Sequence, residues 1–538
     1  MASAQNRQPK KQGFLHGAAI LTAGALLAKM IGALFKIPLT RIITIEGAGH
    51  FNVAYNIYIV LLNVSSTGLP LAVSRLVSQA NTLGQRRQVR SIHHISLLLF
   101  LLVGGICSGF MFFGAQELAN WMRDADAVYA IRVLAPAVLF VCVCSAFRGY
   151  FQGQQYMTPT AVAQVLEALS KLLIGLAAVT FAMSAGWGLP QAAGASILGV
   201  TIGSVLACVY FLWQSRKKPL VLSPEEAASL IQPVLKTAGQ ILRLAIPITI
   251  GSTGLQIFNA LGSKVILGRL QDSLGYDLAQ ASSMYGIYSM AQTLYLLPSA
   301  LVQPLTVSII PAVTEALSLG RHEDARLKEE SAFRIAGLIA LPAGVGLSVL
   351  SVPIQRLLYA YDAQTLALAG PTLSVLGIAS VGYCLILVTN AILQAHGKAA
   401  FAVYSTIAGG ISNLVITYIL VGNPNIHIYG AGAGTVVYCA VTLLCNLLAI
   451  RKLVAAPPRF LAQMGKTALA AGIMGLAAGL FYRFIPNTLA AIAGAGCVYL
   501  AMVILLKVLT WYDCQLLPKG QWIAKLLRIT PRNSLDEN

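Results

Sequence analysis

The chain has 538 residues, of which 57% are hydrophobic and only 10% are charged, whereas a soluble domain carries about 25% charged residues. No Asp, Glu, Lys or Arg occurs between Lys171 and Arg216, or between Lys398 and Arg451. A helix needs about 20 apolar residues to cross the roughly 30 Å apolar core of a bilayer. The composition therefore excludes a soluble protein, and each uncharged run predicts a hairpin of two membrane-spanning helices.

Only helical bundles and closed barrels satisfy the backbone inside a membrane, and barrel strands would alternate polar and apolar residues. The apolar runs here are continuous, so the sequence predicts an all-α polytopic membrane protein of about fourteen transmembrane helices. In chain order we expect them near 14–37, 51–80, 93–115, 129–153, 159–183, 190–213, 240–268, 281–311, 332–353, 364–394, 398–421, 427–450, 464–484 and 488–508.

The two halves of the chain share short stretches of sequence. Pro70-Leu-Ala-Val-Ser74 recurs as Pro304-Leu-Thr-Val-Ser308, and the two uncharged hairpins occupy equivalent places in the two halves. This repeat predicts two pseudo-twofold-related six-helix bundles. The expected parts are a basic N-terminus (1–13), a first bundle (14–213), a linker with an interfacial helix (214–239), a second bundle (240–450), two additional helices (451–508) and a tail (509–538).

Basic residues predict the orientation, because cytoplasmic loops are enriched in Lys and Arg. With the N-terminus inside, alternate connections carry Arg86–Arg90, Arg216–Lys218, Arg321–Lys328 and Arg451–Lys466. We therefore expect a bacterial cytoplasmic membrane protein with both termini in the cytoplasm. This topology explains most of the +19 net charge without a nucleic-acid partner.

Motifs for catalysis are missing from the sequence. There is no Gly-rich phosphate loop ending in Lys-Ser/Thr, and the nine cysteines lack the spacing of metal ligands. We expect reduced cysteines, no catalytic residues, no metal and no cofactor. The membrane potential or an ion gradient would then drive any transport.

Four stretches together resemble one protein family. They are Leu27–Arg41, Ser66–Ser78, Phe147–Thr160 and Leu297–Pro311. They are similar to the multidrug/oligosaccharidyl-lipid/polysaccharide exporter superfamily, in the branch of stage V sporulation protein B and the MurJ-type lipid II flippases. The resemblance implies two six-helix bundles around a V-shaped cavity, fourteen helices in all and an alternating-access cycle.

One stretch departs from the pattern of this family. Proteobacterial MurJ-type flippases carry an Asp-Arg pair shortly before the Phe-Pro of their eighth helix. The corresponding stretch here, Met290-Ala-Gln-Thr-Leu-Tyr-Leu-Leu-Pro298, has no charge. A cationic site must therefore come from other positions, and lipid II specificity does not follow from the resemblance.

Basic residues at membrane depth are candidates for binding the pyrophosphate of a lipid-linked precursor. A charge there costs at least about 2.5 kcal/mol, so it usually faces the bundle interior or a water-filled cavity. We expect a cationic cavity formed by Lys29 and Lys36 together with Lys264 and Arg269 of the second half, and by Arg75. The alternative for Lys36 and Arg75 is a side chain that reaches the membrane interface.

Two further sets of residues are candidates for parts of the protein that move during transport. Glu167 and Lys171 are four residues apart, so they share a helix face and could form a structural ion pair or, with Arg148, a gate or ion-coupling site. Pro298, Pro304 and Pro311 each remove a backbone donor and should bend their helix. They would serve as hinges or as static kinks.

The expected function is translocation of an undecaprenyl-pyrophosphate-linked saccharide, with lipid II as the first candidate. Alternatives are a flippase for another envelope polysaccharide, a cation-coupled multidrug exporter, and a non-transporting scaffold for envelope or sporulation machinery. An exporter of organic cations should carry carboxylates in its cavity, whereas the embedded charges here are mostly basic. Expected partners are the lipid-linked substrate, the bilayer and cell-wall synthesis proteins, and we expect a monomer.

Overall fold

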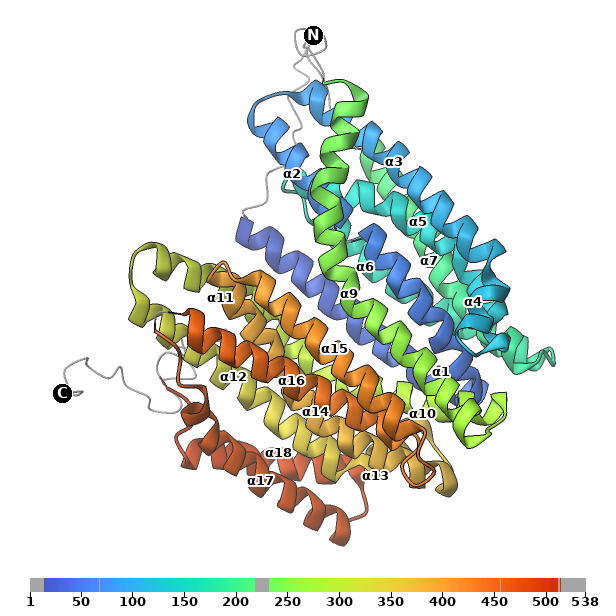
Figure 1. Ribbon diagram of the computed structural model, residues 1–538, viewed down its shortest axis with the longest axis vertical. Helices are drawn as coiled ribbons and strands as arrows, with labels where there is room; N and C mark the ends of the chain where they lie inside the picture. The colour runs from blue at the N-terminus through green and yellow to red at the C-terminus, as the bar shows by residue number, and fades with distance from the viewer. Residues whose placement is uncertain (1–13, 67, 218–231, 455, 511–512, 514–538) are drawn as a thin grey trace. The chain divides into compact units, whose positions relative to one another are not determined.

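The structure is a computed structural model that describes residues 14–66, 68–217, 232–454, 456–510 and 513. Regular structure in these residues is entirely helical, which confirms the predicted all-α class (Figure 1). The chain divides into two compact units, Met1–Gly286 and Ile287–Asn538. This division falls inside one helix, so the domain boundaries expected from the repeat stay a prediction.

The first unit is built mainly from long helices. The bounds are α1 (Phe14–Ser66), α2 (Gly68–Thr82), α3 (Arg86–Phe113), α4 (Ala115–Trp121), η1 (Ala125–Ala127), α5 (Val128–Gly153), α6 (Thr158–Ser184), α7 (Leu189–Lys217), α9 (Val234–Leu274) and α10 (Leu278–Tyr295), whose last residues belong to the second unit. Helix α1 packs against α5, α6, α7 and α9.

The second unit continues the helical pattern. The bounds are α11 (Leu297–Ser318), α12 (His322–Val349), α13 (Ser351–Tyr359), α14 (Ala363–Ala395), α15 (Ala399–Val421), α16 (Tyr429–Leu453), α17 (Phe460–Phe484) and α18 (Thr488–Leu505). The predicted hairpins of both uncharged runs are present, as α6–α7 and α15–α16.

Twelve segments of the described chain are long and apolar enough to cross a membrane. The first of them, Ile20–Thr82, has 63 residues, about 95 Å of helix at 1.5 Å per residue and too long for one crossing. Thr44 interrupts α1 with φ 61° and ψ −178°. Helix α9, with 41 residues, is not among the twelve. The expected count of fourteen is therefore not confirmed.

Several helix boundaries differ from the sequence prediction. The helices expected near 14–37 and 51–80 are replaced by α1, which runs to Ser66, and α2, which begins at Gly68, and the helix expected near 332–353 is divided into α12 and α13. Two further differences lie beside prolines. The helix expected at 281–311 is divided into α10 and α11 around Leu296. The interfacial helix expected in the linker (214–239) lies mostly outside the described residues, and the last residues of the linker begin α9 at Val234 instead. Both differences arise where proline lies in or next to the first turn, because proline cannot supply a helical backbone donor.

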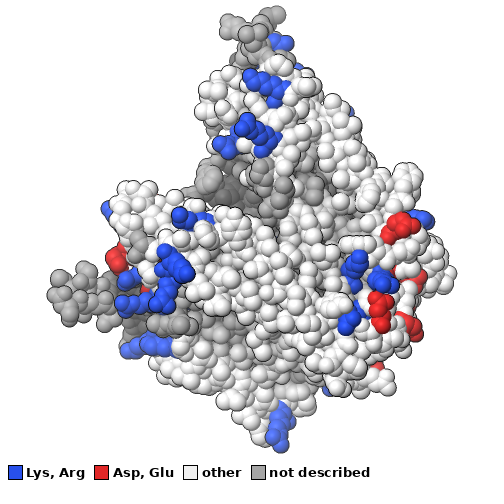
Figure 2. All heavy atoms as spheres, viewed as in Figure 1, with Lys and Arg blue, Asp and Glu red and all other residues white. Residues whose placement is uncertain are grey.

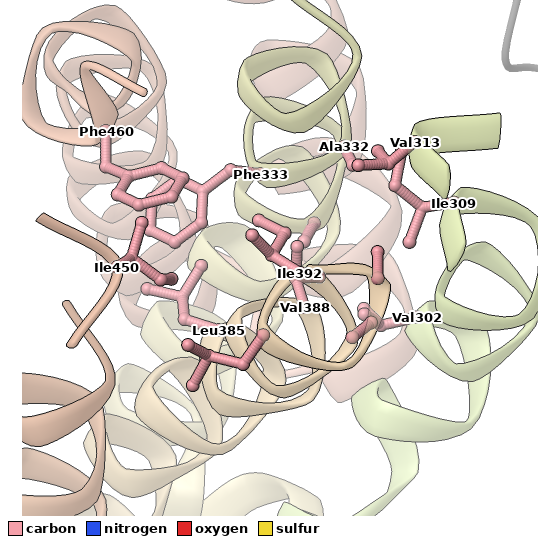
Figure 3. Close-up of a cluster of buried hydrophobic side chains, with 14 of the residues drawn as sticks. Val302, Ile309, Val313, Ala332, Phe333, Leu385, Val388, Ile392, Ile450 and Phe460 are labelled. Atoms are coloured by element: carbon pink, nitrogen blue, oxygen red, sulfur yellow. The ribbon is translucent and has the colours of Figure 1, made fainter. Parts of the chain in front are cut away.

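Apolar side chains from six helices pack in the core of the second unit, and Figure 3 shows part of this cluster. The ring of Phe333 on α12 lies 4.2 Å from that of Phe460 on α17, centroid to centroid. Val388 and Ile392 of α14 and Ile450 of α16 belong to the same cluster. This packing attaches α17, which lies outside the predicted repeat, to the other helices of its unit.

Charged side chains gather at the helix ends on the face shown in Figure 2, and the surface between them is largely uncharged. Large apolar side chains such as Phe113, Phe181 and Leu476 are more than half exposed. Monomeric soluble proteins rarely expose wide apolar surfaces. The described surface is therefore that of a protein surrounded by lipid.

Candidate cationic site in the first unit

Two lysines of the first unit lie near one another within apolar helices. Lys36 follows Phe35 on α1, and its Nζ donates a hydrogen bond to the Asn52 side chain at 3.0 Å. Lys171 lies on α6, close enough for the two ammonium groups to repel each other electrostatically. Both side chains are half-buried.

Aromatic rings surround the Lys171 ammonium group. Its Nζ lies 4.2 Å from the ring centre of Tyr55, 5.1 Å from that of Phe35 and 5.5 Å from that of Phe51. Such contacts contribute about 0.5–2 kcal/mol each, with the larger values in dry surroundings. The ring faces therefore help to stabilise this cation between apolar helices.

An ion pair lies beside this pair of lysines. The Arg148 guanidinium on α5 lies 2.7 Å from the Glu167 carboxylate on α6, and Tyr55 and Tyr58 lie near enough to Glu167 to experience its charge. Glu167 therefore pairs with Arg148, and the Glu167–Lys171 ion pair expected from helical spacing is wrong. Lys171 lacks this carboxylate as a partner.

Close helix packing fixes the position of α6. A Cβ atom at Gly175 would lie 2.7 Å from the Ser196 carbonyl oxygen of α7 and 3.2 Å from the ring of Phe35 on α1. The Ser170 hydroxyl donates to the Gly199 carbonyl of α7 at 3.0 Å. Small residues of this kind allow membrane helices to approach closely. They place Lys171, one turn before Gly175, against the rings of α1.

The remaining predicted cations lie at other points of the same unit. Lys29 on α1 and Arg75 on α2 are exposed. Lys264 of α9 lies with its Nζ 4.2 Å from the ring centre of Trp121 on α4, and Arg269 is half-buried further along α9. A joint cavity of Lys29, Lys36, Lys264 and Arg269 stays a prediction.

The three predicted hinge prolines lie on α11 of the second unit. Pro298 is in the first turn, just after the division between α10 and α11, whereas Pro304 and Pro311 are inside the helix. A first-turn proline removes no helical hydrogen bond. Their role as hinges also stays a prediction.

Sequence reasoning missed the polar and aromatic residues at this site, including Asn52 and Tyr55, which contact the two lysines. Asn52, Tyr55 and Asn56 follow one another at helical spacing in the part of α1 after the break. Asn56 donates to the Ser263 hydroxyl at 2.7 Å and to the Tyr285 hydroxyl at 2.6 Å. A polar stripe inside an apolar span was a signal available in the sequence, because such groups need partners there.

These features define a class of protein: a polytopic membrane protein with two lysines close together within its apolar helices. A family model described as "Polysaccharide biosynthesis protein" matches residues 14–317, and one described as "MatE" matches residues 283–419. The chain belongs to the polysaccharide biosynthesis protein family, within the multidrug/oligosaccharidyl-lipid/polysaccharide exporter superfamily.

Relatives place it in the branch predicted from the sequence. It is 26% identical to the Bacillus subtilis (strain 168) lipid II flippase MurJ, over 76% of this chain and 77% of that protein. It is 25% identical to stage V sporulation protein B of the same strain, over 82% and 84%. The solved inward closed structure of lipid II flippase MurJ matches with a TM-score of 0.67 and 16% identity, over 92% of this chain and 99% of that one. This last likeness shows a common fold.

Proposed function

We propose that the protein translocates an undecaprenyl-pyrophosphate-linked saccharide, most simply lipid II, across the bacterial cytoplasmic membrane by alternating access. The observation that carries the proposal is the arrangement of Lys36 and Lys171 beside each other at membrane depth. The relationship to a lipid II flippase and to a sporulation protein of the same branch supports a lipid-linked envelope precursor as the substrate class.

Two neighbouring ammonium groups form a natural site for a pyrophosphate. Like charges held close in an apolar environment are unfavourable, and each embedded lysine costs about 2.5–3.5 kcal/mol to insert. An anion with two adjacent phosphates would offset the repulsion between Lys36 and Lys171. Both residues keep part of their surface exposed, and we expect the anion to approach from that side.

The contacts of the site also suit release of the bound anion. The Lys36 ammonium is oriented by an amide oxygen, and that of Lys171 by aromatic faces. Neutral partners of this kind do not compete with a phosphate as a carboxylate would. The Glu167 carboxylate, which lies on the same helix as Lys171, is already paired with Arg148 at 2.7 Å.

A multidrug exporter is the alternative on the same fold. Such a carrier would need accessible carboxylates for organic cations, and paired ammonium groups would repel its substrates. The cationic site therefore favours the flippase. A scaffold without transport would gain nothing from the insertion cost of these lysines.

The same proposal has four further parts. They are a monomeric state, cytoplasmic termini, partners in cell-wall synthesis, and an energy supply from the membrane potential or an ion gradient.

Translocation of fluorescent lipids in proteoliposomes tests the function. Three substrates separate the possible specificities: lipid II, an undecaprenyl-pyrophosphate neutral glycan, and an undecaprenyl-monophosphate sugar. We expect both pyrophosphates to move faster than the monophosphate. The protein would be compared with Lys36→Ala, Lys171→Ala and the matched control Lys398→Ala, an exposed lysine of the second unit.

Each site substitution should reduce pyrophosphate translocation at least tenfold, which corresponds to about 1.4 kcal/mol, whereas the control should retain it. Movement of lipid II alone would narrow the substrate to that precursor. If no lipid moves and a cationic dye exchanges for protons or sodium instead, the protein is a drug exporter and the proposal is wrong.

A further inference from the structure

The connection between α4 and α5 is held in place by contacts from α9. The Lys264 Nζ on α9 lies 4.2 Å from the ring centre of Trp121, in a cation–π contact. The Arg123 guanidinium lies 3.0 Å from the Asp272 carboxylate, and the Gln271 side chain donates to the Arg123 carbonyl at 2.7 Å. Arg123 itself has φ 63°, a left-handed conformation that costs about 1 kcal/mol for a residue with a side chain. The contacts with α9 maintain this unfavourable geometry.

The next residue, Asp124, is held from the other side by α1. The His50 Nδ1 lies 2.8 Å from one oxygen of the Asp124 carboxylate and 2.9 Å from the other. Both side chains are completely buried. A carboxylate without water is unfavourable unless it is paired or protonated, so Asp124 depends on the imidazole for its stability in this position.

The second nitrogen of the imidazole has no such partner. His50 Nε2 is buried and accepts or donates no hydrogen bond among the described residues, and the Glu46 carboxylate lies 3.9 Å away on the preceding turn of α1. Burial of the ring disfavours its charged form, whereas the carboxylates of Asp124, Asp126 and Glu46 all favour it. The neighbouring cation, Arg123, is directed to Asp272 instead.

We infer that His50 and Asp124 form a proton-binding site that fastens the α4–α5 connection to α1. With a proton on each nitrogen, the imidazolium balances the Asp124 charge and turns its second N–H towards Glu46. Loss of that proton leaves a buried aspartate beside a neutral ring. The connection is then held less firmly.

The site lies at a place where the fold can transmit such a change. His50 is six residues after Thr44, where α1 is interrupted, and the part of α1 between His50 and Tyr55 carries Asn52, the partner of Lys36. Positive-inside topology predicts that the connection faces away from the cytoplasm. The inference rests on the proposed function in one respect: loss of the contact between His50 and Asp124 would open the outer end of the lipid pathway.

Thermal unfolding of the purified full-length protein between pH 5 and pH 8 tests the proton site without transport. A group that binds a proton more tightly in the folded state stabilises at low pH and loses this effect as the pH rises. We expect His50→Gln to remove part of the decline of Tm with rising pH. The matched control His94→Gln, an exposed histidine on α3, should retain the full decline. Asp124→Asn should also reduce it, and the double variant should add little.

Lipid translocation at several external pH values then tests the coupling. We expect the rate to vary with external pH in the unmodified protein and in His94→Gln, and to vary much less in His50→Gln. Identical pH dependence of Tm in His50→Gln and the unmodified protein would overturn the proton site. If the protein moves no lipid, the Tm series still decides whether the site exists, so failure of the proposed function is seen separately.

Discussion

The Glu167 carboxylate pairs with Arg148 of the neighbouring helix α5, at 2.7 Å, although Lys171 lies one turn further along its own helix α6. The pairing leaves Lys171 with Tyr55, Phe35 and Phe51 around its ammonium group. A pair within one helix would have neutralised this lysine. The pair between helices neutralises the acid instead, and Glu167 leaves the charge of Lys171 unpaired by its own helix.

Breaking this ion pair should destabilise the first unit. The Arg148 and Glu167 side chains are 12% and 27% exposed, so the loss should be about 2 kcal/mol, below the 3–5 kcal/mol of a fully buried pair. Thermal unfolding in detergent of Arg148→Met, of Glu167→Gln and of the double variant would measure it. We expect each single variant to unfold earlier than the double variant, because it retains an unpaired charge. Additive losses would show that the two residues are not coupled.

Tyr55 should matter through its ring rather than its hydroxyl. Tyr55→Leu removes the nearest aromatic face from Lys171, whereas Tyr55→Phe retains it. We expect lipid II translocation to fall about five- to tenfold in the first variant, from the loss of about 1–1.4 kcal/mol, and less than twofold in the second. Equal losses in both variants would assign the effect to the hydroxyl and contradict the cation–π role.

Gly175 should be sensitive to a single added methyl group. Gly175→Ala places the new atom 2.7 Å from the Ser196 carbonyl oxygen, and overpacking of this kind costs about 1–3 kcal/mol. Gly105→Ala on α3 is the matched control, because nothing lies within 4 Å of its added Cβ. We expect Tm to fall in the first variant and to stay level or rise in the second. A fall of the same size in both would mean that helix contact at Gly175 is not the cause.

Two substitutions distinguish a hinge at the α11 prolines from a static kink of the helix. Pro304 is inside the helix and Pro298 is in its first turn, so Pro304→Ala should regain a backbone hydrogen bond and Pro298→Ala should not. If Pro304 is a hinge, we expect Pro304→Ala to raise Tm and slow lipid translocation, with Pro298→Ala changing both less. A higher Tm with an unchanged rate would make Pro304 a static kink.

Asp513 should anchor the chain that follows α18. Its buried carboxylate accepts hydrogen bonds from the Ser331 hydroxyl and from the Thr510 backbone at 2.7 Å, and it pairs with Arg334 at 2.9 Å. Asp513→Ala leaves this arginine, 12% exposed, without the carboxylate, which should cost about 3 kcal/mol. Thermal unfolding would show the loss, and Glu315→Ala, at an exposed position of α11 in the same unit, would serve as the control. Equal Tm values for the two variants would contradict the anchoring role.

The sequence alone determined the features that depend on local composition. The two uncharged runs could only be membrane hairpins, and α6–α7 and α15–α16 are in place, because a bilayer requires about 20 apolar residues per helix and satisfies no free backbone. Lys36, Lys171, Arg148 and Glu167 were all identifiable from the sequence as candidate site residues, since charged residues in largely apolar helices are rare and costly.

The tertiary structure decided which of these charges meet. Helical spacing permits Glu167 to pair with Lys171, but contact with α5 offers a guanidinium at 2.7 Å. The pairing of His50 with Asp124 joins residues 74 positions apart, and no periodicity within either segment indicates it. A buried charge takes the partner that the packing of other helices brings to it, and this packing is a property of the folded chain as a whole.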